Sequence, residues 1–93
     1  MTIEIKKRNN EAVIKVVGVL DNVTADALEK AISSSARNTS VIVLDLNGIE
    51  HISNEGLLVI LGARKKMKEI GELRLTGVCE SVMQVLEATG VNA

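Results

Sequence analysis

Three consecutive polar residues, Ser53, Asn54 and Glu55, follow an apolar run in the middle of the chain. The run at 41–46 has five apolar residues in six, a pattern typical of a buried strand that is covered on both faces. The segment after the polar residues has helical spacing, so we expect a helix to begin near residue 54. Free backbone N–H groups and the positive end of the helix dipole favour anions at such a helix start. The sequence therefore predicts a loop that delivers polar side chains to an anion-tolerant position.

Two interpretations of this loop are compatible. In the first, Ser53 or Asn54 caps the helix, and Glu55 lies in the first turn, where a negative charge is favourable. In the second, the loop is a phosphorylation or contact site. A phosphate on the Ser53 hydroxyl adds about −1.5 to −2 charges, which the helix start tolerates and an acidic partner surface repels.

The same helix is expected to expose an apolar side chain at Leu58, which lies about 200° around the helix axis from Gly56 on the core face. The outward row then consists of Leu58, Gly62, Lys65 and Glu69. A leucine beside a glycine makes a small apolar platform for a partner, and Leu61 extends it at the margin. Single exposed leucines are also ordinary on protein surfaces, and this alternative stays open.

The other residues whose side chains could act in catalysis or bind a metal do not form a recognisable catalytic or metal-binding pattern. His51 is the only histidine and Cys79 the only cysteine, and nothing in the sequence brings them together as a base and a nucleophile. Asp45 alone is thin evidence for a magnesium site, and no glycine-rich phosphate loop or metal-ligand spacing is present. The basic run at 64–68 spreads around the helix and suits a solvated face near its C-terminal end. We expect no enzyme activity, no cofactor and no metal.

Composition narrows the function classes further. The 93 residues include no Phe, Tyr or Trp, so the core is aliphatic and base stacking on aromatic rings is excluded. A net charge of −1 gives no general attraction to nucleic acid or anionic membranes. The single cysteine excludes an internal disulfide and suits a cytoplasmic location. No signal peptide is visible, and no apolar run approaches the roughly 20 residues that span a membrane.

The elements that position the loop form an α/β pattern in one domain over residues 1–93. A hairpin of strands at 3–8 and 12–17 turns at 9–10, and a loop at 18–22 leads to a helix capped by Thr24, with Val23 and Leu28 as a hydrophobic staple. The remaining elements are expected at 24–37 (helix), 41–46 (strand), 54–70 (helix), 72–76 (strand) and 80–89 (helix). The core face of the helix at 54–70 is expected to comprise Gly56, Val59, Ile60, Ala63, Met67 and Ile70. The order β-β-α-β-α-β-α predicts a small mixed β-sheet, an antiparallel hairpin plus parallel strands, with helices packed on it.

This order of elements, with G-V-L-D at 18–21, L-D-L at 44–46 and I-S-N-E-G-L-L-V-I-L-G at 52–62, resembles the STAS domain. That domain is shared by bacterial anti-sigma factor antagonists and the cytoplasmic tails of sulfate transporters. L-x-L-x-G-V at 73–78 and L-E-A-T-G-V at 86–91 extend the resemblance over nearly the whole chain. Family members of this size resemble stand-alone antagonists. They bind a serine-kinase anti-sigma factor when unphosphorylated and release it when phosphorylated.

The chain departs from the family pattern at the phosphate acceptor. The family loop commonly reads D-S-S-G-L or S-S-A-G-L, with the accepting serine two residues before the glycine, and Asn54 occupies that position here. Ser53 is then a displaced acceptor, or the protein is a permanently unphosphorylated binder, or Glu55 lends a fixed charge. One carboxylate is a weak substitute for a phosphate, which speaks against the third alternative. We adopt the second alternative.

The resemblance implies a protein-interaction module for partner switching in transcription regulation, with an anti-sigma factor or related serine kinase as partner. We expect no nucleic-acid binding and no direct membrane insertion. The expected contact residues are Asp21, Asn22, Ser53, Asn54, Glu55, Gly56, Leu58, Leu61 and Gly62. The alternative is a STAS subunit that clasps the ATPase of an ABC-type lipid transport complex. A nucleotide-binding STAS relative is the third hypothesis, and the lack of a phosphate loop speaks against it.

Overall fold

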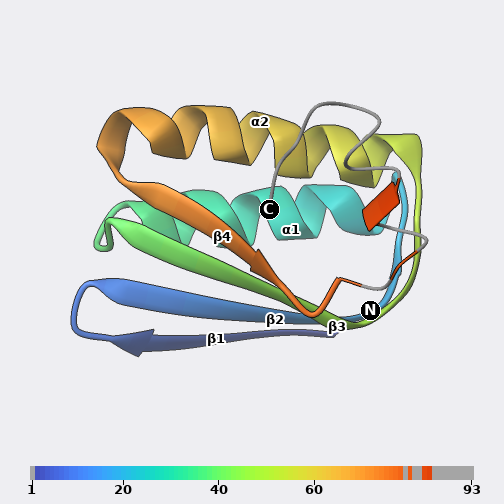
Figure 1. The fold of residues 1–93 in the computed structure, drawn as a ribbon, viewed down its shortest axis with the longest axis horizontal. Coiled ribbons are helices and arrows are strands. Elements are labelled where there is room, and N and C mark those ends of the chain that lie inside the picture. Colours follow the sequence, from blue (N-terminus) through green and yellow to red (C-terminus); the bar gives the residue numbers. More distant parts are fainter. Residues whose placement is uncertain (1, 79, 81–82, 85–93) are drawn as a thin grey trace.

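The computed structural model describes residues 2–78, 80 and 83–84. Within these residues the strands form one sheet in the order β1-β2-β3-β4, with β1 antiparallel to β2 and the other neighbours parallel (Figure 1). The elements are β1 Thr2–Arg8, β2 Glu11–Leu20, α1 Thr24–Ala36, β3 Val41–Ile52, α2 Asn54–Ile70 and β4 Glu72–Thr76. The predicted mixed sheet with an N-terminal hairpin is confirmed. The helix expected at 80–89 lies mainly outside the described residues.

The hairpin turn and the long strands follow from local backbone features. Asn9 has a φ of 56°, a left-handed conformation that asparagine tolerates better than most residues. β2 and β3 both extend past the predicted strand ends, because their pairing continues through two register irregularities, the second beside Gly18. The loop expected at 18–22 therefore begins only after Leu20.

Both helices cover the same face of the sheet (Figure 1). Right-handed crossovers from β2 to β3 and from β3 to β4 step across the sheet in one direction, which places both helices on one side. The buried positions of β2 and β3 accordingly alternate in the regular part of the pairing, at Ala12, Ile14, Val16, Ile42, Leu44 and Leu46. Leu20 and Ile49, beyond the first register irregularity, are buried as well. The expectation that β3 is covered on both faces is wrong. Val41 and Val43 point to the other face and are only half-buried.

The helices complete an aliphatic core. Ala25, Leu28 and Ile32 of α1 are buried as expected, and so are Ile60 and Met67 of α2. Two further core predictions need correction. Ile70 is 55% exposed, because the last turn of α2 presents it to a groove between the helices instead of to the sheet. Leu57, which was not predicted as a core residue, is buried in a small second cluster with Ile52, Leu61, Leu75 and Val78.

Candidate docking site at the ends of β2 and β3

The two loops that were expected to contact a partner lie side by side. β2 and β3 are parallel neighbours, and their last paired residues are Leu20 and Ile52. The turn that begins at Asp21 and the loop that begins at Ser53 therefore leave the same edge of the sheet. The Ser53 N–H donates to the Leu20 carbonyl oxygen over 2.8 Å, which joins the loops directly. Carboxyl ends of parallel strands are a usual position for binding sites in α/β proteins.

Asp21 organises the turn before α1. Its Oδ1 accepts the backbone N–H groups of Val23 and Thr24, each at 3.0 Å. The Thr24 Oγ1 accepts the Asp21 N–H at 2.9 Å, and its own hydrogen lies within reach of the Val19 carbonyl oxygen and of Asp21 Oδ1. The prediction of Thr24 as N-cap is wrong, since Thr24 is the first helical residue. The staple is also wrong, because Val23 is 76% exposed while Leu28 is buried.

These hydrogen bonds make the Asp21 turn sensitive to acid. The Thr24 backbone N–H, together with the Thr24 hydroxyl and the Val23 N–H, lowers the pKa of Asp21 from its ordinary value of 3.8. The ionised carboxylate therefore stabilises the fold above the ordinary pKa, and this contribution disappears as the pH falls through the lower, folded-state pKa. We expect Asp21→Asn to lower the melting temperature at pH 7, and the difference from the parent to shrink below about pH 4. Melting curves at several pH values check this, and a difference that is independent of pH would contradict it.

Ser53 caps α2. It has extended backbone angles, φ −88° and ψ 172°, and its Oγ accepts the Gly56 N–H at 3.2 Å. Glu55 lies in the first turn, and both Asn54 and Glu55 are exposed, whereas Ser53 is half-buried. The capping interpretation is confirmed for Ser53 and the first-turn position for Glu55. A negative charge at this loop faces the free N–H groups of the helix start.

Gly56 allows the first turn of α2 to close on the end of β2. A Cβ atom at this position would lie 2.6 Å from Leu20 Cγ and 3.1 Å from the Leu20 carbonyl oxygen. Any side chain here pushes α2 away from β2 and separates the two loops. In this chain, close packing of α2 against Leu20 therefore explains why the motif has a glycine at position 56.

The outward row of α2 begins next to the loop. Leu58 is 65% exposed, which confirms its predicted orientation, and Gly62, Lys65 and Glu69 are exposed as well. A Cβ at Gly62 would meet nothing within 4 Å, so bare backbone is accessible beside Leu58. Leu61 is half-buried and packs against the second cluster around Leu57. The apolar platform of Leu58 and Gly62 therefore lies one turn beyond the Ser53 loop.

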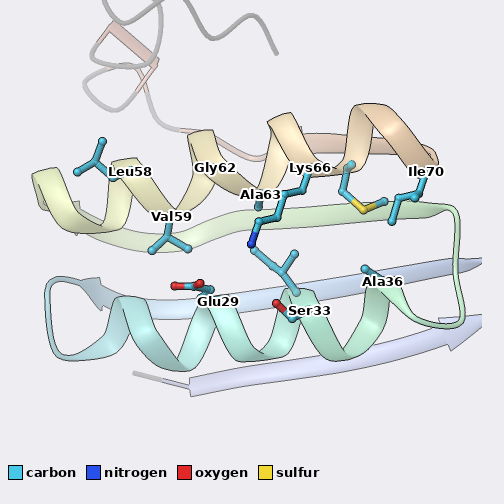
Figure 2. A pocket seen from close by; sticks show the side chains of 11 residues that line it. Glu29, Ser33, Ala36, Leu58, Val59, Gly62, Ala63, Lys66 and Ile70 are labelled. Atoms are coloured by element: carbon cyan, nitrogen blue, oxygen red, sulfur yellow. The ribbon is translucent and has the colours of Figure 1, made fainter.

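A groove between α1 and α2 adjoins this platform and was not predicted from the sequence. It has a volume of about 440 Å³, and Leu58 and Gly62 form part of its wall (Figure 2). Its other lining residues are Glu29, Ile32, Ser33, Ala36, Val59, Ala63, Lys66, Met67 and Ile70. Helical periodicity assigned most of the apolar residues among these to the core: Ile32, Val59, Ala63, Met67 and Ile70. The distance between two packed helices cannot be inferred from the local sequence.

The remaining candidates form no second site within the part of the chain that the structure describes. His51 is exposed and Cys79 lies outside the described residues. Asp45 Oδ1 accepts the backbone and side-chain N–H groups of Asn47, at 3.0 and 2.8 Å. Over residues 2–78, 80 and 83–84, no group of His, Cys, Asp or Glu is arranged to hold a metal ion. No helix in these ranges is long and apolar enough to cross a membrane.

Known proteins resemble this chain in sequence and in fold. The anti-sigma-B factor antagonist of Listeria monocytogenes is 30% identical over 95 residues, which cover 99% of this chain and 83% of the relative. The anti-sigma-F factor antagonist RsfB of Mycobacterium tuberculosis is 32% identical over 68 residues, 72% of this chain. That match spans only 56% of RsfB.

A solved anti-sigma factor antagonist from Mycobacterium paratuberculosis shares the fold, with a TM-score of 0.85 and 24% identity. The match covers 96% of this chain and 77% of that protein. The model of the STAS domain matches residues 2–93. The chain therefore belongs to the STAS domain family.

Proposed function

We propose that this chain is a non-enzymatic anti-sigma factor antagonist, which binds an anti-sigma factor in the cytoplasm. The observation that carries the proposal is the exposed Leu58–Gly62 platform directly beyond the joined Asp21 and Ser53 loops. An apolar centre with a polar rim is the usual composition of a protein interface. The relatives named as antagonists support this class of partner.

The proposed contact surface consists of Asp21, Asn22, Ser53, Asn54, Glu55, Gly56, Leu58, Leu61 and Gly62. Direct binding to a purified anti-sigma factor from the same organism, measured by calorimetry, tests the proposal. Binding to the ATPase of an ABC-type transporter instead would favour the lipid-transport alternative.

We further propose that the partner is of the serine-kinase type and that phosphorylation does not release it from this chain. Asn54, at the family's acceptor position, has no hydroxyl and is exposed. The neighbouring Ser53 has a hydroxyl, but this side chain is half-buried and its Oγ accepts the Gly56 N–H. A kinase must place the attacking oxygen in line with the transferred phosphate, which requires Ser53 to leave its capping position. Glu55 supplies one negative charge, fewer than a phosphate, and lacks the three phosphate oxygens.

Asn54→Ser is expected to create the missing switch. The variant presents a hydroxyl at the exposed first position of α2, where the helix dipole stabilises the phosphate that it receives. After incubation with ATP and a cognate kinase anti-sigma factor, we expect one added phosphate on the variant and none on the parent, as measured by intact mass. The phosphorylated variant is expected to bind the partner more weakly. Adding Ser53→Ala to the variant is the control and should leave the phosphate in place. A phosphate on the parent chain that maps to Ser53 would contradict the proposal.

A further inference from the structure

The groove between α1 and α2 has an apolar floor and two apolar ends. Ile32 and Met67 are buried at its base, and Leu58 and Ile70, which are 65% and 55% exposed, stand toward opposite ends of α2. Figure 2 shows side chains from both helices directed into the space between them. Exposed large apolar residues that share one concave surface are a feature of interaction sites.

The α2 wall of this groove is a regular ridge. Leu58, Gly62, Lys66 and Ile70 follow one another at intervals of four residues, which places them on one i, i+4 row of the helix surface. The apolar residues stand at the two ends, the glycine and the long lysine between them. If an identical ridge is laid against it in the opposite direction, Leu58 faces Ile70 of the second copy. Gly62 then faces the aliphatic stem of Lys66, which fits over a position without a side chain.

The charges of the groove match the same arrangement. Among the described residues that line it, Glu29 on α1 is the acid and Lys66 on α2 is the base. Lys66 extends from α2 over the groove (Figure 2), and the two ion pairs formed by the described residues include neither Lys66 nor Glu29. In a dimer with a two-fold axis, Lys66 of each copy can pair with Glu29 of the other, and this contact then forms twice.

We propose that the α1–α2 groove binds a second copy of this chain, in a two-fold dimer with the α2 helices antiparallel. A standard interface buries roughly 800 Å² on each partner. The two longer extents of the whole molecule, 32 and 26 Å, set an upper limit of the same order for a contact on one face. Dimer formation covers four exposed side-chain positions of α2 in each copy.

A consequence for regulation rests on the proposed function. Leu58 and Gly62 belong both to the dimer ridge and to the anti-sigma factor platform, so one α2 helix cannot serve both partners. The dimer is then a stored form that cannot bind the anti-sigma factor, and the monomer is the active form. Protein concentration then controls how much of the chain can bind the anti-sigma factor, which phosphorylation cannot do because Asn54 has no hydroxyl.

The test is sedimentation equilibrium of the full chain over a wide concentration range, with two charge-reversal variants. We expect the parent to approach twice its 9.9 kDa monomer mass as concentration rises. Glu29→Lys places two lysines opposite each other in the dimer, and Lys66→Glu places two glutamates opposite each other, so each variant alone should sediment as a monomer. An equimolar mixture of the two variants should regain the dimer mass, because each lysine then faces a glutamate.

Two further variants separate this interface from other surfaces. Ile70→Lys should abolish the dimer while binding of the anti-sigma factor persists, since Ile70 lies outside the proposed anti-sigma factor contacts. Val17→Lys, a change of the same kind at a 40% exposed position on β2, should leave the dimer intact. A parent chain that stays monomeric at all concentrations would overturn the proposal and would leave the groove to a helix of another protein. A dimer that survives Ile70→Lys, or a mixture of charge variants that stays monomeric, would overturn it as well.

Discussion

Replacing Leu58 by lysine is expected to weaken binding of the anti-sigma factor by about thirtyfold or more, while the free energy of unfolding changes by less than about 0.5 kcal/mol. The side chain is 65% exposed in the free protein, so the fold loses little when it changes. In the complex it is expected to be covered, and a lysine there must lose its hydration without gaining a partner. The change also blocks the approach of a partner backbone to Gly62. Titration calorimetry with the purified anti-sigma factor measures the affinity, and a thermal melt measures the stability.

Val17→Lys is the matched control for this experiment. It introduces the same charge at another exposed apolar position, on β2 and away from both loops and the α2 ridge. Its affinity for the anti-sigma factor should equal that of the parent. Equal binding by Leu58→Lys would remove the platform from the proposed interface.

Ile60→Ala is expected to produce the largest loss of stability in α2, about 2–5 kcal/mol. Ile60 is fully buried, and its removal leaves a cavity between the helix and the sheet in a core that has no aromatic side chain to fill it. The total free energy of unfolding of such a domain is only about 5–15 kcal/mol. Each kcal/mol that is lost lowers the melting temperature by roughly 4–8 °C. Urea denaturation measures the effect.

Leu58→Ala provides the comparison, because it removes a similar side chain two positions away on the exposed side of the same helix. It should change the free energy of unfolding by less than about 0.5 kcal/mol. An Ile60→Ala loss below about 1 kcal/mol would contradict the assignment of this position to the core. The two variants together distinguish the buried face of α2, which stabilises the fold, from the exposed face, which is proposed to bind partners.

Local patterns account for most of the fold that the sequence predicted. The alternation of Ile3 and Ile5 in β1, the asparagines at the hairpin turn and the spacing of Leu28 and Ile32 are signals that each lie within a few residues. The exposed position of Leu58 followed from the same periodicity. Spacing alone favoured a helix cap at the Ser53 loop, and the family resemblance added the expectation that this loop contacts a partner.

The errors concern features that depend on how distant segments meet. Five apolar residues in six suggested a strand covered on both faces. The direction of two successive crossovers instead places α1 and α2 on the same face, and Val41 and Val43 on the other face are only half-buried. Ile70 had the periodicity of a core residue, but the separation of α1 and α2 turns it toward the groove. Thr24 is a residue type that is common at helix caps. In the structure the Asp21 carboxylate accepts two N–H groups of this turn instead.

The docking claim is tested most directly by NMR titration of the isotope-labelled chain with the anti-sigma factor. The account predicts that signals of the two loops and the outer face of α2 change first, at Asp21, Asn22, Asn54, Glu55, Leu58 and Gly62. Signals of β1 and of the sheet face opposite α1 and α2 should stay unchanged. Changes concentrated on that sheet face, with the Ser53 loop and Leu58 unaffected, would contradict it.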